Sequence, residues 1–381
     1  MTRRPLVVEA EPAFRTAHAN PYNASLYRAV GRLGVRVDDL SVRRLATRRV
    51  DVVHLHWPDL TFLSSHRPLT VLLRLATFFG ALRLARLRGT RLVWTAHNLA
   101  SHEQRSTPAL RALFRRLLLA NLDGVLTLTA DGAAAVRDLD PALADLPTFV
   151  TPHGHYRDDY DFTITRAQAR ERLAISPHVR LVVTVGQIRP YKNVPRLIEV
   201  FAQVPDPQAR LAVVGKPSGG VDADGLRALA EADERVIAEL EFLPADRLAL
   251  WLRAADLVVL PYRRIQNSGS ALLALSADRP VLVPAIGAMT ELAETVGPGW
   301  VRCYDGDLDA ATLGDALAWA AAPRPEVCDL DGLGWDRIAV ATVEAYESVL
   351  AAPRRRRGSS AARTRTPARG ASDAVGNRAR A

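Results

Sequence analysis

Lysine and cysteine are both scarce in this 381-residue sequence, and each scarcity is informative. The two cysteines, Cys303 and Cys328, form no CxxC pair, so nothing indicates a disulfide framework or a cysteine zinc site. The patterns GxGxxG and GxxxxGK[ST] are also missing, which weighs against a dehydrogenase and a P-loop enzyme. The remaining candidates are other enzymes and binding proteins.

Long apolar segments are missing as well. The amino-terminal residues lack the apolar core of a signal peptide, and no uninterrupted apolar run reaches the roughly 18–20 residues of a membrane-spanning helix. We therefore expect a cytoplasmic protein that can associate peripherally with a membrane.

Charge is distributed unevenly along the chain. Residues 1–160 have a net charge of +8, residues 161–353 of −7, and residues 354–381 of +8. A basic amino-terminal half indicates an anionic surface or partner. The arginine-rich tail leaves a nucleic-acid-binding protein as an alternative class, but no nucleic-acid module is visible, and we expect no nucleic acid partner.

Short apolar runs alternate with amphipathic helical patterns, which is typical of parallel sheets with crossover helices. The sequence predicts an α/β fold of two Rossmann-like, doubly wound domains that face each other across a cleft. We expect the domains at residues 1–155 and 156–335, a helix over 336–352 that crosses back to the first domain, and a disordered arginine-rich tail over 353–381. The expected strands are residues 5–10, 50–56, 91–96, 124–129 and 148–152 in the first half, and 180–186, 210–215, 256–262, 280–284 and 300–304 in the second.

Two loops of the second half combine features of a phosphate site. In the first, "GQIRPYKN", a strand ends at Gly186, Arg189 and Lys192 follow, and Asn193 is placed to cap the next helix. Lys192 is one of only two lysines in a chain that otherwise uses arginine, and lysine offers a compact charge on a flexible stem. Exposed amides at a helix start favour an anion there.

The second loop opens another helix in the same half of the chain. It contains Asn267, Ser268, Gly269 and Ser270. Ser268 can cap this helix, and Gly269 permits close approach of a ligand. Because ligands of doubly wound sheets bind beyond the carboxyl ends of the strands, we expect both loops to hold a nucleotide-sugar donor at the cleft.

Seven segments occur together in the order "NPYNASLYRAV" (20–30), "DVVHLHWPD" (51–59), "AHNLASHE" (96–103), "HGHYRD" (153–158), "GQIRPYKN" (186–193), "NSGSALLALSADRPVL" (267–282) and "VGPGWVRCYDG" (296–306). In combination they resemble GT-B glycosyltransferases, and within these the inverting GDP-mannose:glycolipid β-1,4-mannosyltransferases of xanthan-type exopolysaccharide assembly. The resemblance implies a GDP-mannose donor, a polyprenyl-diphosphate-linked oligosaccharide acceptor, a β linkage, no metal cofactor, and attachment to the inner membrane face.

The chain departs from many retaining GT-B enzymes at three positions. Ile265 and Leu273 stand where those enzymes have glutamates, and Gln187 stands where they have arginine, with Arg189 as the substitute. Their ribose and sugar contacts therefore do not transfer to this chain, and the departure fits the β-mannosyltransferase resemblance.

An inverting transfer needs one group to accept the proton of the acceptor hydroxyl. Asp59 and Glu103 are the carboxylate candidates and His97 is the imidazole candidate; His97 also resembles a GT-B histidine that contacts the donor sugar. HxH pairs occur at 54–56 and 153–155, but no cysteine joins them and we expect no metal site.

Residues 67–91 and 105–120 hold six and four arginines, respectively, with no acidic residue, on an apolar background. They predict either core-packing helices with arginine-rich outer faces or a basic apolar surface that contacts anionic lipid. Two functional alternatives also stay open: a GT-B transferase that uses another nucleotide sugar such as UDP-glucose, and a sugar-nucleotide epimerase of the same architecture.

Overall fold

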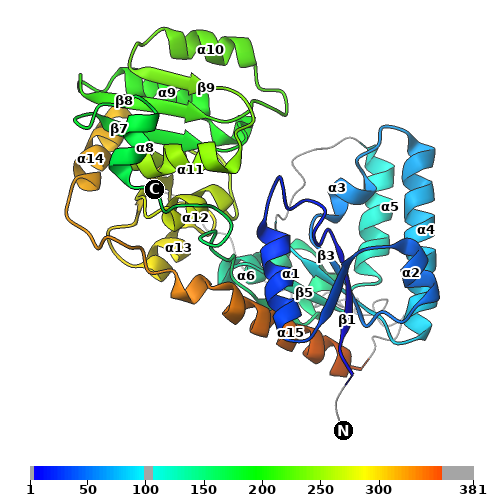
Figure 1. Cartoon of the computed structure of the whole chain (residues 1–381). Helices are drawn as coiled ribbons and strands as arrows, with labels where there is room; N and C mark the ends of the chain where they lie inside the picture. Colours follow the sequence, from blue (N-terminus) through cyan, green and yellow to red (C-terminus); the bar gives the residue numbers. More distant parts are fainter. Residues whose placement is uncertain (1–3, 98–105, 354–381) are drawn as a thin grey trace, which may run out of the picture.

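The computed structural model describes residues 4–97 and 106–353, which form two lobes (Figure 1). Each lobe contains a parallel sheet of six strands. The first sheet has the order β2-β1-β3-β4-β5-β6 and the second the order β12-β11-β10-β7-β8-β9. The prediction of an α/β fold with two doubly wound domains is confirmed.

The strands of the first sheet all precede residue 155: β1 (Val7–Glu11), β2 (Arg36–Asp39), β3 (Val52–Leu55), β4 (Arg91–Thr95), β5 (Gly124–Thr127) and β6 (Thr148–Val150). Those of the second sheet lie within 156–335: β7 (Arg180–Val185), β8 (Ala209–Val214), β9 (Val236–Glu239), β10 (Leu257–Val259), β11 (Val281–Pro284) and β12 (Val301–Tyr304). The ten strands expected from the sequence are present. The two strands that the sequence analysis does not predict, β2 and β9, are edge strands with mostly part-exposed residues. Three of the four residues of β2 are charged, and the apolar run of β9 is only three residues long.

Helices connect the strands of both sheets. In the first half they are α1 (Tyr22–Arg32), α2 (Val42–Thr47), α3 (Pro58–Phe62), α4 (Pro68–Leu87), α5 (Pro108–Leu119), α6 (Ala130–Leu139) and α7 (Pro141–Ala144). In the second they are α8 (Arg166–Arg172), α9 (Val194–Ala202), α10 (Ala223–Glu231), α11 (Ala245–Ala254), α12 (Gly269–Ser276), α13 (Met289–Val296), α14 (Ala310–Ala320) and α15 (Trp335–Ala351). The short helices α2, α3, α7 and α8 were not expected, because each is too short to show a full period of apolar positions.

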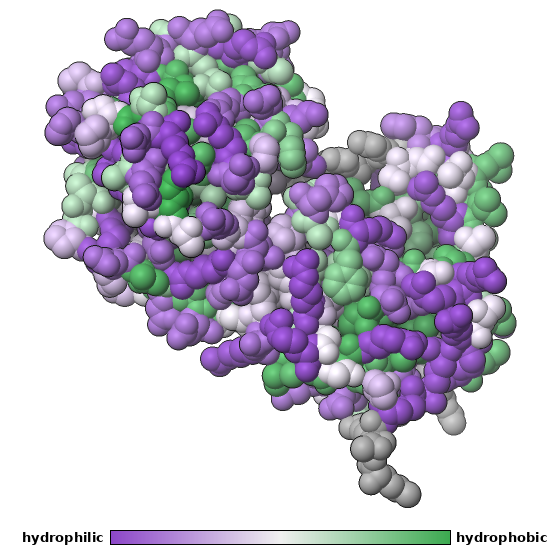
Figure 2. Space-filling model, in the orientation of Figure 1, coloured by the Kyte–Doolittle hydropathy of each residue, from purple (hydrophilic) through white to green (hydrophobic). Residues whose placement is uncertain are grey.

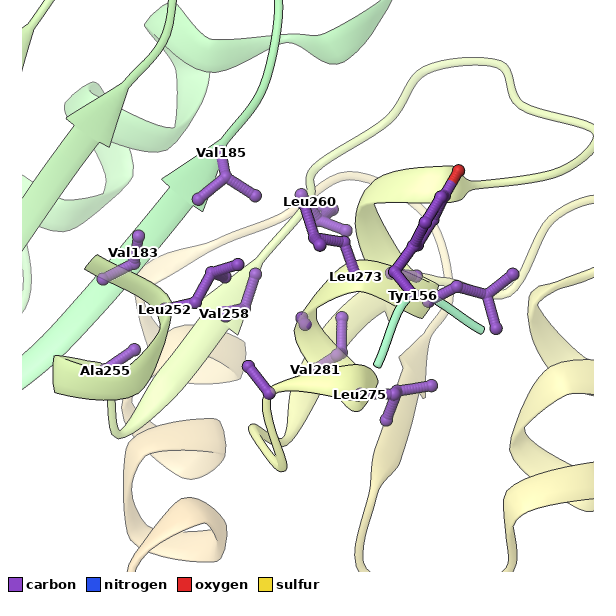
Figure 3. Packing of buried hydrophobic residues seen from close by; sticks show 14 of the residues in the cluster. Tyr156, Val183, Val185, Leu252, Ala255, Val258, Leu260, Leu273, Leu275 and Val281 are labelled. Carbon is purple, nitrogen blue, oxygen red and sulfur yellow. The ribbon is translucent and has the colours of Figure 1, made fainter. Parts of the chain in front are cut away.

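The second lobe has a core on each face of its sheet, one against α9 and α14 and one against α11 and α12. Val183, Leu252, Val258 and Leu273 pack together in the second of these cores, and all four are buried (Figure 3). Leu273, one of the positions at which the sequence analysis notes a departure from many retaining GT-B enzymes, therefore contributes to packing. The ring of Tyr156 borders the same cluster, with its hydroxyl directed away from the apolar side chains (Figure 3).

Helix α15 links the two lobes. It starts beside the second lobe and runs beneath the first, next to α1 (Figure 1). Tyr346 and Val349 belong to the same buried cluster as residues of β1 and α1. At the other end, the indole nitrogen of Trp335 donates a hydrogen bond to the carbonyl oxygen of His155 (2.8 Å). The expected arginine-rich tail lies, after Pro353, outside the described residues.

Helix α4 is long and apolar enough to cross a membrane by length and composition, and a third of its apolar stretch is buried inside the protein. Val71, Leu75, Phe78 and Leu82 form its inner side and pack in the core of the first lobe. An ordinary core-packing role thus accounts for one side of the helix.

The junction between Gly154 and α15 leaves no space for a side chain. A Cβ at Gly154 would lie 2.4 Å from the indole of Trp335. We expect Gly154→Ala to lower the free energy of unfolding by about 1–3 kcal/mol, because the rigid indole must move. Gly314→Ala in α14 is the control: nothing lies within 4 Å, and alanine favours the helix, so it should stabilise slightly. Chemical denaturation checks both, and equal stability of the two variants would contradict the tight junction.

Candidate functional site

Lys192 lies in the first predicted donor loop, but it is buried and bonded within the protein. The loop forms a 3₁₀ turn (Pro190–Lys192), and the lysine side chain turns back toward the end of β7. Its Nζ donates to the carbonyl oxygen of Val185 (3.2 Å) and to Oγ of Ser270 (3.2 Å). Burial and the nearby Arg189 lower the pKa of Lys192 to about 8. The side chain therefore remains largely protonated at neutral pH.

Gly186 makes room for this arrangement. Its φ of +92° lies in a region that favours glycine, and a Cβ there would come within 3.0 Å of Lys192 Nζ and 3.1 Å of Ser270 Oγ. The two predicted donor loops thus meet at one point, where the glycine, the lysine and the serine converge. Sequence reasoning placed all three in the donor site but did not predict that they touch.

The expectation that Asn193 caps the next helix is wrong. Asn193 adopts the left-handed conformation (φ 55°) and its side chain makes no capping hydrogen bond to α9. The 3₁₀ turn that precedes it sets this geometry, because the residue must reverse the chain between two helical segments. Arg189, in the same loop, is half-buried and donates to Oε1 of Gln187 (2.8 and 3.0 Å).

The second predicted loop forms the start of α12. Ser268 is buried, and its Oγ accepts a hydrogen bond from the amide of Ala271 (3.1 Å) as a helix cap. The same Oγ is 2.7 Å from the hydroxyl of Tyr262. Gly269 lies close to Tyr156, whose hydroxyl would be 3.1 Å from a Cβ at that position. The absence of a Cβ at Gly269 therefore makes room for Tyr156, which lies in the segment that connects the lobes.

The two lobes touch at this point. Asn267 Nδ2 donates to the carbonyl oxygen of His97 (3.2 Å), which joins the start of α12 to the end of β4. A cavity of about 110 Å³ lies beside this contact. Thr129 and His153 from the first half line it together with Asn267 and Ser268 from the second. The predicted donor loops and His97 thus lie at one interface, where the two sheets meet.

His97 sits in a cluster of aromatic rings at the carboxyl end of β4. Its ring stacks on Trp57 (centroids 4.2 Å apart) and lies edge-on to Tyr22 (5.0 Å). Burial lowers the pKa of His97 well below its usual value, and that of His153 to about 4. Both imidazoles are therefore neutral near pH 7. Sequence analysis did not single out Tyr22, a buried tyrosine that an amphipathic pattern alone cannot tell from core packing.

Asp59 lies in the first turn of α3, just after His56 and Trp57. It is part-exposed, and burial of its surroundings raises the pKa of its carboxyl group. Within the described residues the carboxylate has no ion pair, unlike Glu11 at the end of β1, which pairs with Arg15. Glu103, the other carboxylate candidate, lies outside the described residues.

The HxH pairs do not form a metal centre in the described part of the chain, where no group of three or more His, Cys, Asp or Glu side chains is placed to hold an ion. His54 is fully buried, and its ring stacks on that of His56 (4.3 Å). In the second pair, His155 is half-buried while His153 faces Tyr22 (4.5 Å).

Comparison with known proteins identifies the family. Residues 179–321 match the model described as "Glycosyl transferases group 1". The chain is 36% identical over 340 residues to the GDP-mannose:glycolipid 4-beta-D-mannosyltransferase of Xanthomonas campestris pv. campestris, covering 88% of this chain and 90% of that enzyme. It is also 30% identical over 249 residues to a D-inositol 3-phosphate glycosyltransferase of Mycolicibacterium gilvum, covering 60% of this chain and 53% of that one.

Solved structures agree on the fold. A sucrose-phosphate synthase from Thermosynechococcus elongatus superposes with a TM-score of 0.63 at 18% identity, over 92% of this chain and all of that one. The Anabaena protein HepE in complex with UDP gives a TM-score of 0.59 at 14% identity, over 90% of this chain and 98% of that one. With two parallel-sheet lobes that meet at the predicted donor loops, and a relative alike over nearly its whole length, the chain belongs to the group 1 glycosyltransferases of GT-B fold.

Proposed function

We propose that the protein transfers mannose from GDP-mannose, with inversion to a β linkage, onto a polyprenyl-diphosphate-linked oligosaccharide in exopolysaccharide synthesis. The observation that carries the proposal is the similarity to the Xanthomonas mannosyltransferase over 88% of the chain. The residues where the chain departs from retaining relatives, Ile265 and Leu273, support inversion.

A panel of donors and acceptors tests this function. We expect GDP to raise the melting temperature more than UDP does, and mannose to pass from GDP-mannose to a lipid-linked oligosaccharide. The anomeric configuration of the product, determined by NMR, should be β. A preference for UDP or turnover of UDP-glucose would rule out GDP-mannose as the donor. Conversion of a sugar nucleotide without any acceptor would favour an epimerase.

The donor diphosphate is proposed to lie over the two converging loops. Lys192 and Ser270 form the floor there, in the space that Gly186 leaves for them. Arg189 adds a second cation at the rim of the same loop. A charge on Lys192 would oppose the negative charge that grows on the diphosphate as the sugar leaves. These cations serve the role that a metal ion has in other transferases, so we propose metal-independent activity, to be checked in excess EDTA.

Substitution of Lys192 measures this role. Lys192→Ala should lower kcat/KM by about 10²–10³, as for other preorganised charge stabilisers. Because Lys192 in the ligand-free protein has a pKa of about 8, binding of an anion should raise that pKa, and the protein should take up a proton near pH 8. Calorimetry of GDP binding in buffers of different ionisation enthalpy detects the proton.

The matched variant is Lys192→Arg, since arginine stays protonated and should bind GDP with no proton uptake. Lys216, the other lysine, follows β8, and its substitution controls for general loss of charge. Wild-type turnover by Lys192→Ala would remove Lys192 from the donor site.

The acceptor base is proposed to be a carboxylate. Asp59 fits because its pKa is raised by burial, its side chain has no ion pair within the described residues, and it follows β3 at the same end of the sheet as His97. A carboxylate with a raised pKa takes a proton more readily at neutral pH. Glu103 stays the alternative.

The outer side of α4 is proposed to contact a membrane. Leu69, Leu73, Leu84 and Leu87 are exposed by 50–81% and recur at intervals that place them on one side of the helix. The hydrophobic surface is visible along the right edge of the molecule, where Figure 1 places α4 (Figure 2). The exposed Arg83 lies on the same helix and Arg116 on the neighbouring α5, which suits anionic headgroups. Peripheral attachment at the inner membrane face would bring the water-soluble donor to a membrane-held acceptor.

Not every arginine of residues 67–91 is available to lipid. Arg86 donates to the carbonyl oxygen of Asn121 and to the carboxylate of Asp123, and Arg88 donates to the carbonyl oxygen of Leu45. These two arginines tie α4 to its own lobe. The leucines are therefore the better test of membrane contact.

Replacing Leu73 and Leu84 together by serine should weaken binding to anionic vesicles at least about tenfold, because each leucine would lose apolar burial worth about 1.5–3 kcal/mol. Leu33→Ser is the matched control, since Leu33 is 48% exposed at the end of α1. Sedimentation with phosphatidylglycerol vesicles measures the binding. Equal binding by the double variant and the control would rule out this surface.

A further inference from the structure

A chain of buried hydrogen bonds runs from β4 into the site and ends at His97. Thr95 Oγ1 is 2.7 Å from His54 Nε2, and His54 Nδ1 is 2.9 Å from the hydroxyl of Tyr27. The same hydroxyl is 2.5 Å from His56 Nε2, and His56 Nδ1 is 2.9 Å from His97 Nε2. All five side chains are buried.

The three imidazoles of this chain of hydrogen bonds are neutral. Burial lowers the pKa of His54 to about 3 and lowers the pKa values of His56 and His97 well below the usual range. A neutral imidazole carries one N–H, so one ring nitrogen donates and the other accepts. Two imidazoles in direct contact therefore share one direction, whereas the hydroxyl of Tyr27 has one hydrogen and two lone pairs and can also accept from the imidazoles on both sides.

Two uniform directions are therefore possible, and a third arrangement reverses at Tyr27, which then donates to Tyr346. In the first, Thr95 donates to His54, the protons point from one residue to the next, and His97 Nε2 accepts, which leaves the proton of His97 on Nδ1. In the second, His97 Nε2 donates inward and Nδ1 of His97 is bare. The choice decides whether His97 offers a ligand a donor or an acceptor.

Thr95 excludes the second direction. Its hydroxyl is 1% exposed, and across the described residues its one side-chain hydrogen bond is to His54. In the second direction that hydroxyl accepts from His54, and its own hydrogen is left without an acceptor in the core, which is costly. In the first direction the hydrogen is used.

Helix α15 completes the chain at its inner end. The hydroxyl of Tyr346 is 2.7 Å from His54 Nδ1 and is hydrogen bonded to that of Tyr27. With Nδ1 of His54 as donor, Tyr346 donates to the hydroxyl of Tyr27 and Tyr27 donates to His56, so both hydroxyl hydrogens have an acceptor. A reversal at Tyr27 would leave the hydrogen of Tyr346 without an acceptor among the described residues. The first direction is thus the one in which Thr95, Tyr27 and Tyr346 all use their hydrogens.

We propose that Thr95, His54, Tyr27 and His56 are positioning residues that fix the proton of His97 on Nδ1, which makes His97 a neutral hydrogen-bond donor to a hydroxyl of the donor sugar. This inference rests on the proposed function for the identity of the ligand. It removes His97 from the three candidates for the base. Nδ1 of His97 already holds a proton, and Nε2 already accepts a hydrogen bond from His56, so neither nitrogen can take the proton of the acceptor hydroxyl. Asp59 and Glu103 remain.

The direct test is NMR of the full chain labelled with ¹⁵N-histidine at pH 7.5. The ring signals of His97, assigned by their loss in His97→Asn, should show a protonated Nδ1 and an unprotonated Nε2. In Thr95→Val and in Tyr27→Phe the His97 signals should report a mixture of the two tautomers. In the same two variants kcat/KM for GDP-mannose should fall about tenfold, the value of one neutral hydrogen bond.

Three matched variants separate positioning from packing. Thr95→Ser keeps the hydroxyl and should restore the wild-type tautomer. Thr342→Val removes a buried hydroxyl that donates only to the carbonyl oxygen of Ile338 within α15, so it should leave His97 unchanged. Asp59→Asn should keep the tautomer, whichever of the two carboxylates is the base.

Two results would overturn the inference: a wild-type His97 with its proton on Nε2, or an unchanged tautomer in both Thr95→Val and Tyr27→Phe. Because the spectra are recorded without substrate, they stand apart from the proposed function. If the protein shows the expected tautomer but does not turn over GDP-mannose, the positioning role stands and the proposed donor is wrong.

Discussion

The packing of α15 against the first sheet is the constraint on which the site depends. A helix that follows the last strand of the second sheet ends in the core of the first, where Tyr346 and Val349 are fully buried. Its start is held by Trp335 against Gly154 and His155. Parallel sheets bind ligands at the carboxyl ends of their strands. The fixed position of α15 therefore determines whether these ends of the two sheets can contact the same ligand. The contact between Asn267 and His97 shows that they meet.

The two edges contribute different chemistry to that meeting point. The second lobe supplies Lys192, a buried cation that donates to Val185 and Ser270. The first lobe supplies neutral imidazoles, since burial suppresses their protonation. A charged group suits a diphosphate, while neutral donors suit the hydroxyls of a sugar. The orientation of a nucleotide sugar across the interface would follow from this difference alone.

Much of the architecture could be read from the sequence, because ten strands are apolar runs that end at glycine, proline or polar residues. The failures have physical causes. The edge strands β2 and β9 are partly exposed and contain at most three consecutive apolar residues. Asn193 follows a 3₁₀ turn that no local pattern announces. Arg86 and Arg88 look like surface charges in the sequence, yet their partners Asn121 and Leu45 lie more than 30 residues away.

The histidine chain illustrates what sequence reasoning can and cannot reach. The spacing of His54 and His56 places both on one face of β3, so their proximity is predictable. Their role is not, because it depends on Tyr27 from α1 and Tyr346 from α15, which only the crossing helix brings to the same place. A metal site was the nearest alternative for two HxH pairs. Hydrogen bonds among neutral rings instead use both nitrogens of His54 and His56, which leaves neither nitrogen free to bind an ion.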